Sequence, residues 1–178
     1  MPAILTIVNG GMRASARPAA VFIPHMEHMQ QNLPVGLAMR LPDRILFSEP
    51  SDIQEDQLVV RSFPSSNPQS FTVSLFTCDR NPQPCLLGSF MVDKSTSVSA
   101  QRELQRHQAL GDYVTLDKNI RGYLIEGPRQ NPYSAFSTFM WQQNGMIYSL
   151  SFPAIEQQNM LQMAVSMARE RPFYRIGD

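Results

Sequence analysis

Two cysteines are the side chains best suited to covalent chemistry in this sequence. Cys78 and Cys85 are the only cysteines, and the segment 79–84 between them is rich in turn-forming residues. The segments 71–77 and 86–92 on either side read as strands, which predicts an antiparallel hairpin. If Cys78 lies opposite Cys85, their sulfur atoms come within reach of a disulfide. The pattern leaves three states open: a disulfide, a reduced buried pair and a redox-active pair.

The register of this hairpin follows from the same pairing of the cysteines. The pairs that then share one face of the hairpin are Phe71 with Val92, Val73 with Phe90, and Leu75 with Gly88. One apolar face is what a half-buried hairpin requires. A disulfide here would also indicate an oxidising compartment.

Three histidines are the next candidates, as metal ligands or as acid–base groups. His25 and His28 are three residues apart in a segment with helical periodicity, so their imidazoles would share a face that a metal could use. The segment lacks the further Glu or His of a helical zinc motif. His107 lies on a distant, polar segment. We therefore expect solvated surface histidines and predict no metal site.

Other catalytic signatures are missing from the sequence. Gly-x-Ser-x-Gly and the Gly-rich phosphate loops do not occur. The only two lysines, Lys94 and Lys118, lie outside Gly-rich loops. The acidic segment 48–57 lacks the ligand spacing and the turn glycine of a calcium loop, so we expect a solvated loop there. The sequence thus identifies no catalytic residue and no cofactor, and it favours a non-enzymatic protein without deciding the point.

Charge and composition argue against two classes of partner. The 178 residues carry 15 Lys and Arg against 15 Asp and Glu, so the basic excess typical of nucleic-acid or membrane-surface binding is missing. Arg61, Arg121 and Arg129 could share a surface, but the sequence does not place them relative to one another. No apolar run approaches the roughly 18 to 20 residues of a membrane span. We predict no nucleic-acid partner and no integral membrane span.

The chain length suits one domain. We predict a disordered or processed segment at residues 1–20 and a single α+β domain at residues 21–178. Ala14-Ser15-Ala16 fits the small-x-small rule of signal-peptide cleavage, but the apolar stretch before it is short and is followed by Arg13. As written, the sequence indicates a cytoplasmic protein. An extracytoplasmic location would follow if the two cysteines are oxidised and the true start lies upstream, so localisation stays open.

The clearest local signal is Asn144-Gly145, because both central residues of a type I′ turn need a positive φ. A two-residue loop at this point places Trp141 opposite Tyr148. The apolar face of the resulting hairpin over 135–152 carries Phe139, Trp141, Tyr148, Leu150 and Phe152. Because the other face is largely polar, we expect an antiparallel sheet that is solvated on one side.

The remaining elements complete an α+β pattern. Apolar spacing predicts a helix over 22–33, strands over 58–63, 113–116 and 120–126, a polar helix over 100–110 with Ser99 as its N-cap, and a last helix after Pro153. Residues 64–70 read as a connector. The last helix carries an apolar stripe of Leu161, Ala164, Val165 and Ala168, which Met160, Met163 and Met167 widen. The predicted fold class is α+β: a curved antiparallel sheet of several hairpins, packed on one face by N-terminal and C-terminal helices.

Methionines fall on the predicted faces of both terminal helices. They are Met26, Met29, Met160, Met163 and Met167. Flexible thioethers suit an adaptable ligand groove, but they also fill cores. Helical spacing alone predicts the core role, which we adopt.

The segment Trp141 to Tyr148 (WQQNGMIY), followed by residues 160–168, resembles the C-terminal domain of unknown function in sporulation-type anti-sigma-like proteins. In that domain a Trp-containing strand, a Gly turn, a Tyr-containing strand and a short last helix recur in this order. The resemblance implies a relation to half-barrel lipoprotein carriers and sigma-regulatory domains of the bacterial envelope. Residues 35–172 are also similar to uncharacterised cyanobacterial proteins. Only Trp141, Gly145 and Tyr148 carry over, as structural positions of the hairpin.

Three functions are compatible with these features. The first is a non-enzymatic binding or sensing module for an apolar ligand or a protein, with unknown ligand-binding residues. The second is a small enzyme whose site is assembled from scattered residues such as His25, His28 or His107 and acidic groups. The third is a structural or assembly partner that pairs through an exposed sheet edge. The oligomeric state is left open.

Overall fold

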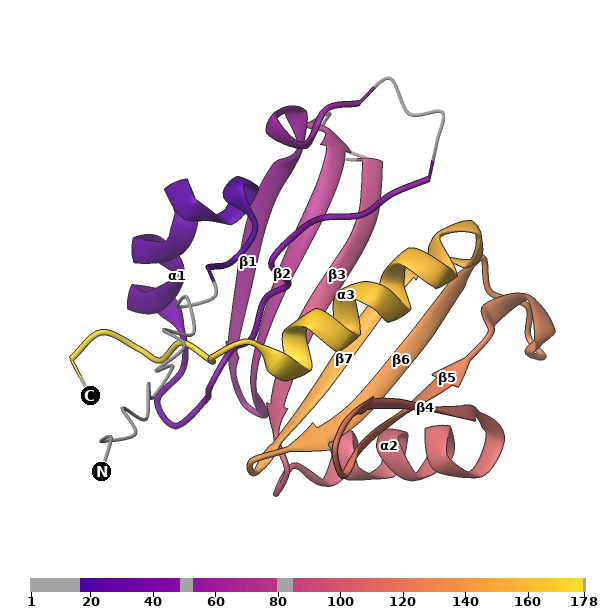
Figure 1. Cartoon of the computed structure of the whole chain (residues 1–178). Helices are drawn as coiled ribbons and strands as arrows, with labels where there is room; N and C mark the ends of the chain where they lie inside the picture. Colours follow the sequence, from indigo (N-terminus) through magenta and orange to yellow (C-terminus); the bar gives the residue numbers. More distant parts are fainter. Residues whose placement is uncertain (1–16, 49–52, 80–84, 178) are drawn as a thin grey trace, which may run out of the picture.

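A computed structural model of the chain describes residues 17–48, 53–79 and 85–177. Within them, seven strands form one antiparallel sheet in the order β1-β2-β3-β7-β6-β5-β4 (Figure 1). The strands are β1 (Val59–Ser66), β2 (Gln69–Cys78), β3 (Cys85–Lys94), β4 (Asp112–Asp117), β5 (Ile120–Ile125), β6 (Phe136–Gln143) and β7 (Met146–Pro153). The α-helices are α1 (Met26–Asn32), α2 (Val98–Leu110) and α3 (Gln157–Arg169). Short 3₁₀ helices are η1 (Ala20–His25), η2 (Glu55–Gln57), η3 (Gly127–Arg129) and η4 (Ala154–Glu156).

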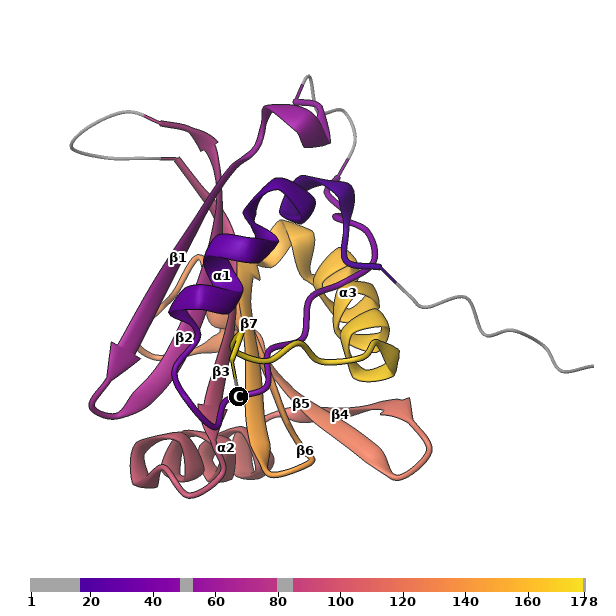
Figure 2. The same ribbon diagram turned by 90° about the vertical axis from the view of Figure 1, so that its left-hand side faces the viewer.

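The predicted α+β class is confirmed. The N-terminal helices η1 and α1 and the C-terminal helix α3 cover one face of the curved sheet (Figure 2). Their buried side chains, including Phe22, Met29 and Met160, belong to one apolar cluster with the aromatic residues of β3, β6 and β7. At its centre the rings of Trp141 and Tyr148 are stacked with centroids 5.3 Å apart. This cluster is the main core of the protein.

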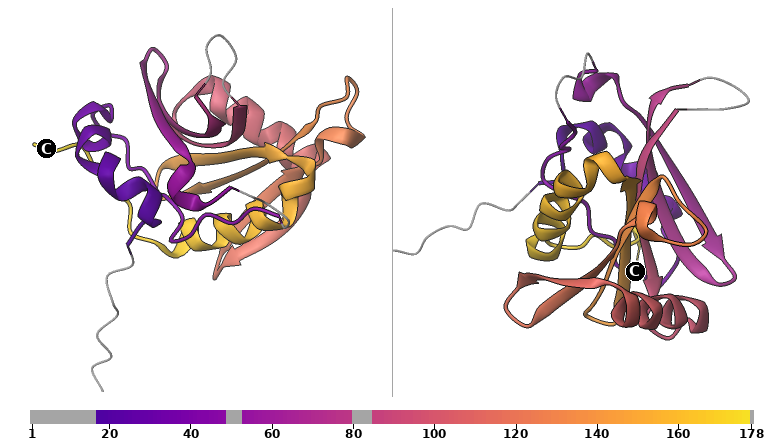
Figure 3. Two further views of the ribbon diagram at one scale, coloured as in Figure 1. Left: turned by 90° about the horizontal axis from the view of Figure 1, so that it is seen from above. Right: turned by 90° about the vertical axis from the view of Figure 1, so that its right-hand side faces the viewer.

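Helix α2 packs against the opposite face of the sheet, which the sequence had indicated to be solvated. Seen from above, α3 and α2 lie on opposite sides of β6 and β7 (Figure 3). Ala100 and Leu104 of α2 are buried against Met140 of β6 and Ile147 of β7 in a small second cluster. Only Ala100 and Leu104 of this cluster belong to α2, and two apolar side chains are too few to make an apolar stripe visible in a polar helix. The second face is therefore covered in part.

The registers of both predicted hairpins are confirmed. In the β2–β3 hairpin Val73 pairs with Phe90, and the predicted partners on either side also pair. In the β6–β7 hairpin Trp141 pairs with Tyr148. The turn residues Asn144 and Gly145 have φ values of 50° and 78°, as a type I′ turn requires.

Two local predictions are wrong, and a third is confirmed in part. Residues 64–70 are not only a connector: β1 continues to Ser66 and β2 begins at Gln69, because Pro64 is tolerated on an edge strand. Ser97, rather than Ser99, caps α2, and its hydroxyl accepts a hydrogen bond from the backbone N–H of Ala100. The predicted apolar face of α3 is confirmed in part: Ala164, Ala168 and the methionines beside them (Met160, Met163 and Met167) are buried, whereas Leu161 and Val165 are only half-buried.

The two ends of the described chain meet on the α1 side of the sheet. Met39 and Phe173 form an isolated antiparallel β-bridge, in which the N–H of each residue donates to the carbonyl of the other. The N–H of Ile176 donates to the carbonyl of Gln30. Ala19 is buried, and its N–H donates to the carbonyl of Pro42. Most of the predicted disordered or processed segment, residues 1–16, lies outside the described residues, but residue 19 belongs to the folded part.

Candidate functional site

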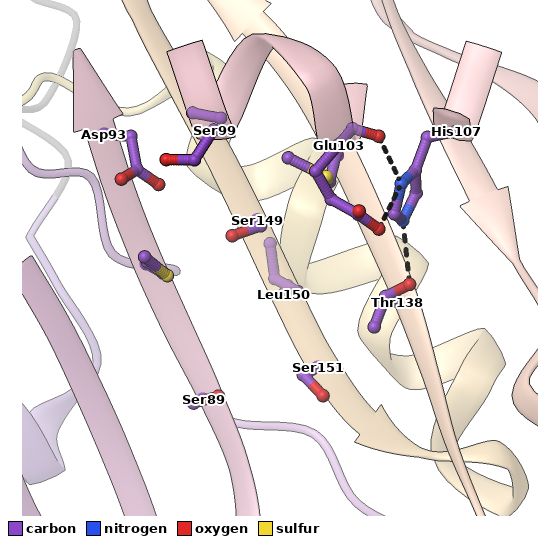
Figure 4. A pocket seen from close by; sticks show the side chains of 12 residues that line it. Ser89, Asp93, Ser99, Glu103, His107, Thr138, Ser149, Leu150 and Ser151 are labelled. Atoms are coloured by element: carbon purple, nitrogen blue, oxygen red, sulfur yellow. Dashed lines mark hydrogen bonds and ion pairs between the residues drawn. The ribbon is translucent and has the colours of Figure 1, made fainter. Parts of the chain in front are cut away.

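A cavity of about 280 Å³ lies between α2 and the second face of the sheet. Twelve residues from β3, β6, β7 and α2 line it (Figure 4). Its apolar walls include Met91 of β3, Met140 of β6 and Ala100 of α2. A cavity of about 150 Å³ is enough to hold benzene. The cavity therefore has room for a small organic molecule.

Hydroxyl groups form one part of this lining because strand residues alternate between the two faces. Ser89 of β3 pairs with Ser151 of β7, and Ser151 pairs in turn with Thr138 of β6. The three hydroxyls therefore lie in one row across the sheet. In the next row Ser149 of β7 lies between Met91 and Met140. The surface offers hydrogen-bonding groups beside thioethers.

Asp93 of β3 supplies the buried acid of the cavity. The residue is 6% exposed, its carboxylate makes no hydrogen bond or ion pair with any described residue, and its oxygens stay accessible through the cavity. Figure 4 shows it beside Ser99 at one end of the site. Burial raises the pKa of the Asp93 carboxyl to about 6. At neutral pH the side chain thus carries a charge that has no partner among the described residues.

Glu156, at the start of α3, is a second buried acid, and it differs from Asp93 in its hydrogen bonding. It is 8% exposed, but its carboxylate accepts hydrogen bonds from the backbone N–H and hydroxyl of Ser48 and from the side-chain amide of Asn159. Buried charges in proteins are normally compensated in this way. Asp93 departs from that pattern.

His107 of α2 lies at the other end of the cavity, hydrogen-bonded on both ring nitrogens. Its Nδ1–H donates to the backbone carbonyl of Glu103 at 2.9 Å, because a carbonyl can only accept. In the neutral ring Nε2 is then an acceptor, and the hydroxyl of Thr138 donates to it at 2.8 Å. Burial lowers the pKa of His107, which favours this neutral form, although the carbonyl and carboxylate of Glu103 oppose the shift.

The expectation of a solvated His107 is therefore wrong. The side chain is 1% exposed, because α2 packs it against β6. The sequence showed a His on a polar helix and gave no sign that this face of the sheet would be covered. The Glu103 carboxylate lies 3.4 Å from Nδ1 of His107. The Thr138 hydroxyl, the His107 imidazole and the Glu103 carboxylate therefore follow one another in the order found in a nucleophilic relay.

The other two histidines do not join this site. His28 is exposed and His25 half-buried, both near the edge strand β1 on the side of α1. Across residues 17–48, 53–79 and 85–177, no group of three or more His, Cys, Asp or Glu side chains is placed to hold a metal ion. Residues 49–52 of the acidic segment lie outside the described residues.

The two cysteines form a disulfide, Cys78 to Cys85, with Cα atoms 5.1 Å apart. It joins the ends of β2 and β3 and lies outside the lining of the cavity. Trp141 and Tyr148 are fully buried in the main core, and Gly145 lies in the turn between their strands. These residues have structural positions, and none of them contacts the cavity.

The three arginines singled out from the sequence do not share a surface. Arg61 lies on β1 and pairs with Asp79, whereas Arg121 lies on β5, near the opposite edge of the sheet. Arg129 pairs with Glu126 at 2.6 Å.

The helical methionines are part of the main core, as adopted from the sequence. The methionines that line the cavity are Met91 and Met140, on strands. Strand alternation predicts that Met91 and Met140 share a face with Ser149 only when the pairing of β7 with β3 and β6 is known.

None of the described helices is long and apolar enough to cross a membrane.

Comparison with known proteins adds no relative. No protein-family model, no curated protein sequence and no solved structure matches the chain. The cavity and its polar groups are therefore the basis for a functional proposal.

Proposed function

We propose that this protein is a non-enzymatic binding or sensing module whose small ligand occupies the cavity between α2 and the sheet. The observation that carries the proposal is the cavity itself, with a volume of about 280 Å³ and walls that combine Met91 and Met140 with hydroxyl groups. Ligand sites are typically apolar hollows with a few polar groups that fix orientation. The ligand class that fits is a molecule with a compact apolar body and one or two polar groups.

The way in which α2 is held on the sheet supports a sensing role. This helix rests on the sheet through a small cluster in which Ala100 and Leu104 meet Met140 and Ile147. A molecule in the cavity would contact α2 and the sheet at once. Its binding would therefore shift the equilibrium between positions of α2 on the sheet. A helix held by few apolar contacts is the element that a ligand can most readily stabilise or displace.

The proposal is tested by methionine-methyl NMR, with small aromatic fragments such as benzyl alcohol as probes. Met91 and Met140 report on the cavity, whereas Met160 and Met163 of the main core serve as internal controls. We expect concentration-dependent shifts of the first pair only. Shifts spread over all four, or none at millimolar probe, would contradict the proposal.

A cavity-filling variant sharpens this test. Ser149→Ile places a larger side chain between Met91 and Met140 and should abolish the shifts. Thr72→Ile is the matched control, because Thr72 pairs with Met91 from the other side but lies outside the cavity lining. Equal binding by the two variants would place the probe elsewhere.

A second candidate function is acyl transfer or ester hydrolysis by the relay of Thr138, His107 and Glu103. The distances of 2.8 Å and 3.4 Å along the relay favour it. Against it, Thr138 is paired on both sides, with Ile125 and Ser151, so the nearby backbone N–H groups are used in the sheet ladder and are not free as oxyanion donors. Binding is therefore the function that the geometry supports best.

Hydrolysis of p-nitrophenyl acetate separates the two candidates. A relay enzyme should lose its activity in Thr138→Val and retain it in Thr138→Ser, which keeps the nucleophilic hydroxyl. A binding module should show the same background rate in all three proteins.

A further inference from the structure

We propose that the ligand of this cavity is a small organic ammonium ion, an amine with an apolar body, whose charge pairs with the carboxylate of Asp93. The inference rests on the proposed binding function and specifies its ligand class. It follows from a buried acid that opens into the cavity and has no partner among the described residues.

The first step is the charge of Asp93. With a pKa raised to about 6, the carboxyl is mainly ionised at neutral pH despite its burial. Leaving such a charge unpaired is costly, as the four hydrogen bonds around Glu156 illustrate by contrast. A cationic ligand would remove this cost when it binds, and an anionic ligand would increase it.

The second step is the absence of a cation in the surroundings that the structure describes. From α2, Glu103 and the neutral His107 face the cavity, together with Ser99. From the neighbouring strands, Asp93 pairs with Ser70 of β2 and Ile147 of β7, neither of which is charged.

The adjacent Lys94 does not neutralise Asp93. Successive strand residues point to opposite faces, and the ammonium of Lys94 lies against Gly36, where an added Cβ would come within 2.8 Å of Nζ. Lys94 is therefore directed to the other face of the sheet.

The third step is the kind of cation. The described residues hold no group of three acidic, His or Cys side chains for a metal ion. The walls next to Asp93 instead carry the thioether of Met91, and Ser99 and Ser149 offer hydroxyl oxygens. One carboxylate beside apolar groups and hydroxyls suits an ammonium, which brings its own N–H donors and an organic body.

The experiment compares three probes of similar size and different charge: benzylamine, benzyl alcohol and benzoate. Binding is followed by the Met91 and Met140 methyl signals at pH 7.5. We expect benzylammonium to bind at least about fivefold more tightly than benzyl alcohol, as one charge-assisted hydrogen bond allows. Benzoate should be the weakest of the three.

Variants assign the preference to Asp93. Asp93→Asn keeps the shape of the side chain and should reduce the preference for the amine to less than about twofold, with benzyl alcohol binding unchanged. Asp112→Asn, the same substitution at an exposed position of β4, should leave the preference intact. In the wild type, the preference should also weaken at pH 5, because Asp93 then takes up a proton.

The outcomes separate this inference from the proposed function. Equal binding of the amine and the alcohol, or a preference that survives Asp93→Asn, would overturn the ammonium inference and leave the binding function standing. Failure of all three probes to shift the Met91 and Met140 signals would overturn both.

Discussion

At the scale of single residues, the buried acid Asp93 is the most unusual feature of the protein. An ionised carboxylate without a partner is a cost that folding must offset elsewhere. Such costs persist in proteins chiefly where a group is needed for binding or chemistry. The same residue thus has a consequence for stability that can be measured without any ligand.

Removing the charge of Asp93 should stabilise the free protein. Because the folded-state pKa of about 6 lies above the ordinary value of 3.8, the free energy of unfolding falls as the pH rises from about 4 to 6. Asp93→Asn should therefore raise it by about 1–3 kcal/mol at pH 7.5 and change it little at pH 4. Urea unfolding at both pH values measures this. A variant less stable than wild type at pH 7.5 would show that an unrecognised partner compensates the charge.

His107 should have the opposite pH dependence. His107→Ala leaves the Thr138 hydroxyl without its partner and removes a buried side chain, so we expect a loss of about 2–3 kcal/mol at pH 7.5. Because burial lowers the pKa of His107, the unfolded chain takes up the proton first, and this stabilisation declines as the pH falls through about 6.5.

Urea unfolding at pH 7.5 and 5.5 checks the expectation for His107. The difference between wild type and His107→Ala should shrink at the lower pH. The control His28→Ala removes an exposed imidazole and should stay within about 0.5 kcal/mol of wild type. Equal losses for the two variants would contradict the buried position of His107.

At the scale of elements, hairpins determine the sheet, and the β2–β3 hairpin carries a covalent link. Cys78 and Cys85 are opposed in the register, seven positions apart in the sequence, and are joined by a disulfide. The β6–β7 hairpin reaches its register without such a link, through its Asn144-Gly145 turn. The disulfide therefore fixes the end of a hairpin whose connecting loop is longer.

Loss of the disulfide should destabilise the protein by about 2 kcal/mol, because the oxidised link restricts the unfolded chain. The comparison is urea unfolding of the wild type, with and without reductant, against the Cys78→Ser/Cys85→Ser variant. Reductant should lower the wild-type midpoint to that of the variant and leave the variant unchanged. Two free thiols in freshly isolated native protein, found by alkylation and mass measurement, would contradict the oxidised state.

At the scale of the whole molecule, Arg40 connects segments that are far apart in the sequence. It is 4% exposed and donates hydrogen bonds to the hydroxyl of Tyr148 on β7 and to the carbonyls of Met167, Ala168 and Glu170 at the end of α3. The carbonyl end of a helix attracts a cation and lacks internal partners. A single side chain thereby holds the N-terminal segment, the sheet and the last helix together.

Arg40→Ala should cost about 2–4 kcal/mol, since it leaves several buried acceptors without donors. Arg40→Lys should recover only part of this loss, because one ammonium cannot replace the planar guanidinium. Urea unfolding measures the cost, and amide exchange should show the last turn of α3 opening first. Arg44→Ala, at an exposed position nearby, is the control; a similar loss there would contradict the role assigned to Arg40.

Local patterns determined most of the fold. The Asn144-Gly145 turn needs a positive φ, and strand alternation has a period of two, so both hairpin registers follow from residues close in sequence. The apolar positions of α3 likewise indicated that it would cover the aromatic face, although its most buried side chains are the methionines. These features rest on interactions within or between neighbouring elements.

Only the tertiary structure decided where the site lies. The cavity forms because α2 crosses to the second face of the sheet, and two apolar residues of that helix were too weak a signal to foresee it. His107, which the sequence indicated to be solvated, is buried because α2 packs on the sheet, and Asp93 of β3 is buried in the same cavity. The sequence by itself therefore determined the strands, turns and main core, which depend on local periodicity. The packing of α2 on the sheet depends on long-range contacts. This packing also creates the cavity in which the Asp93 carboxylate lies.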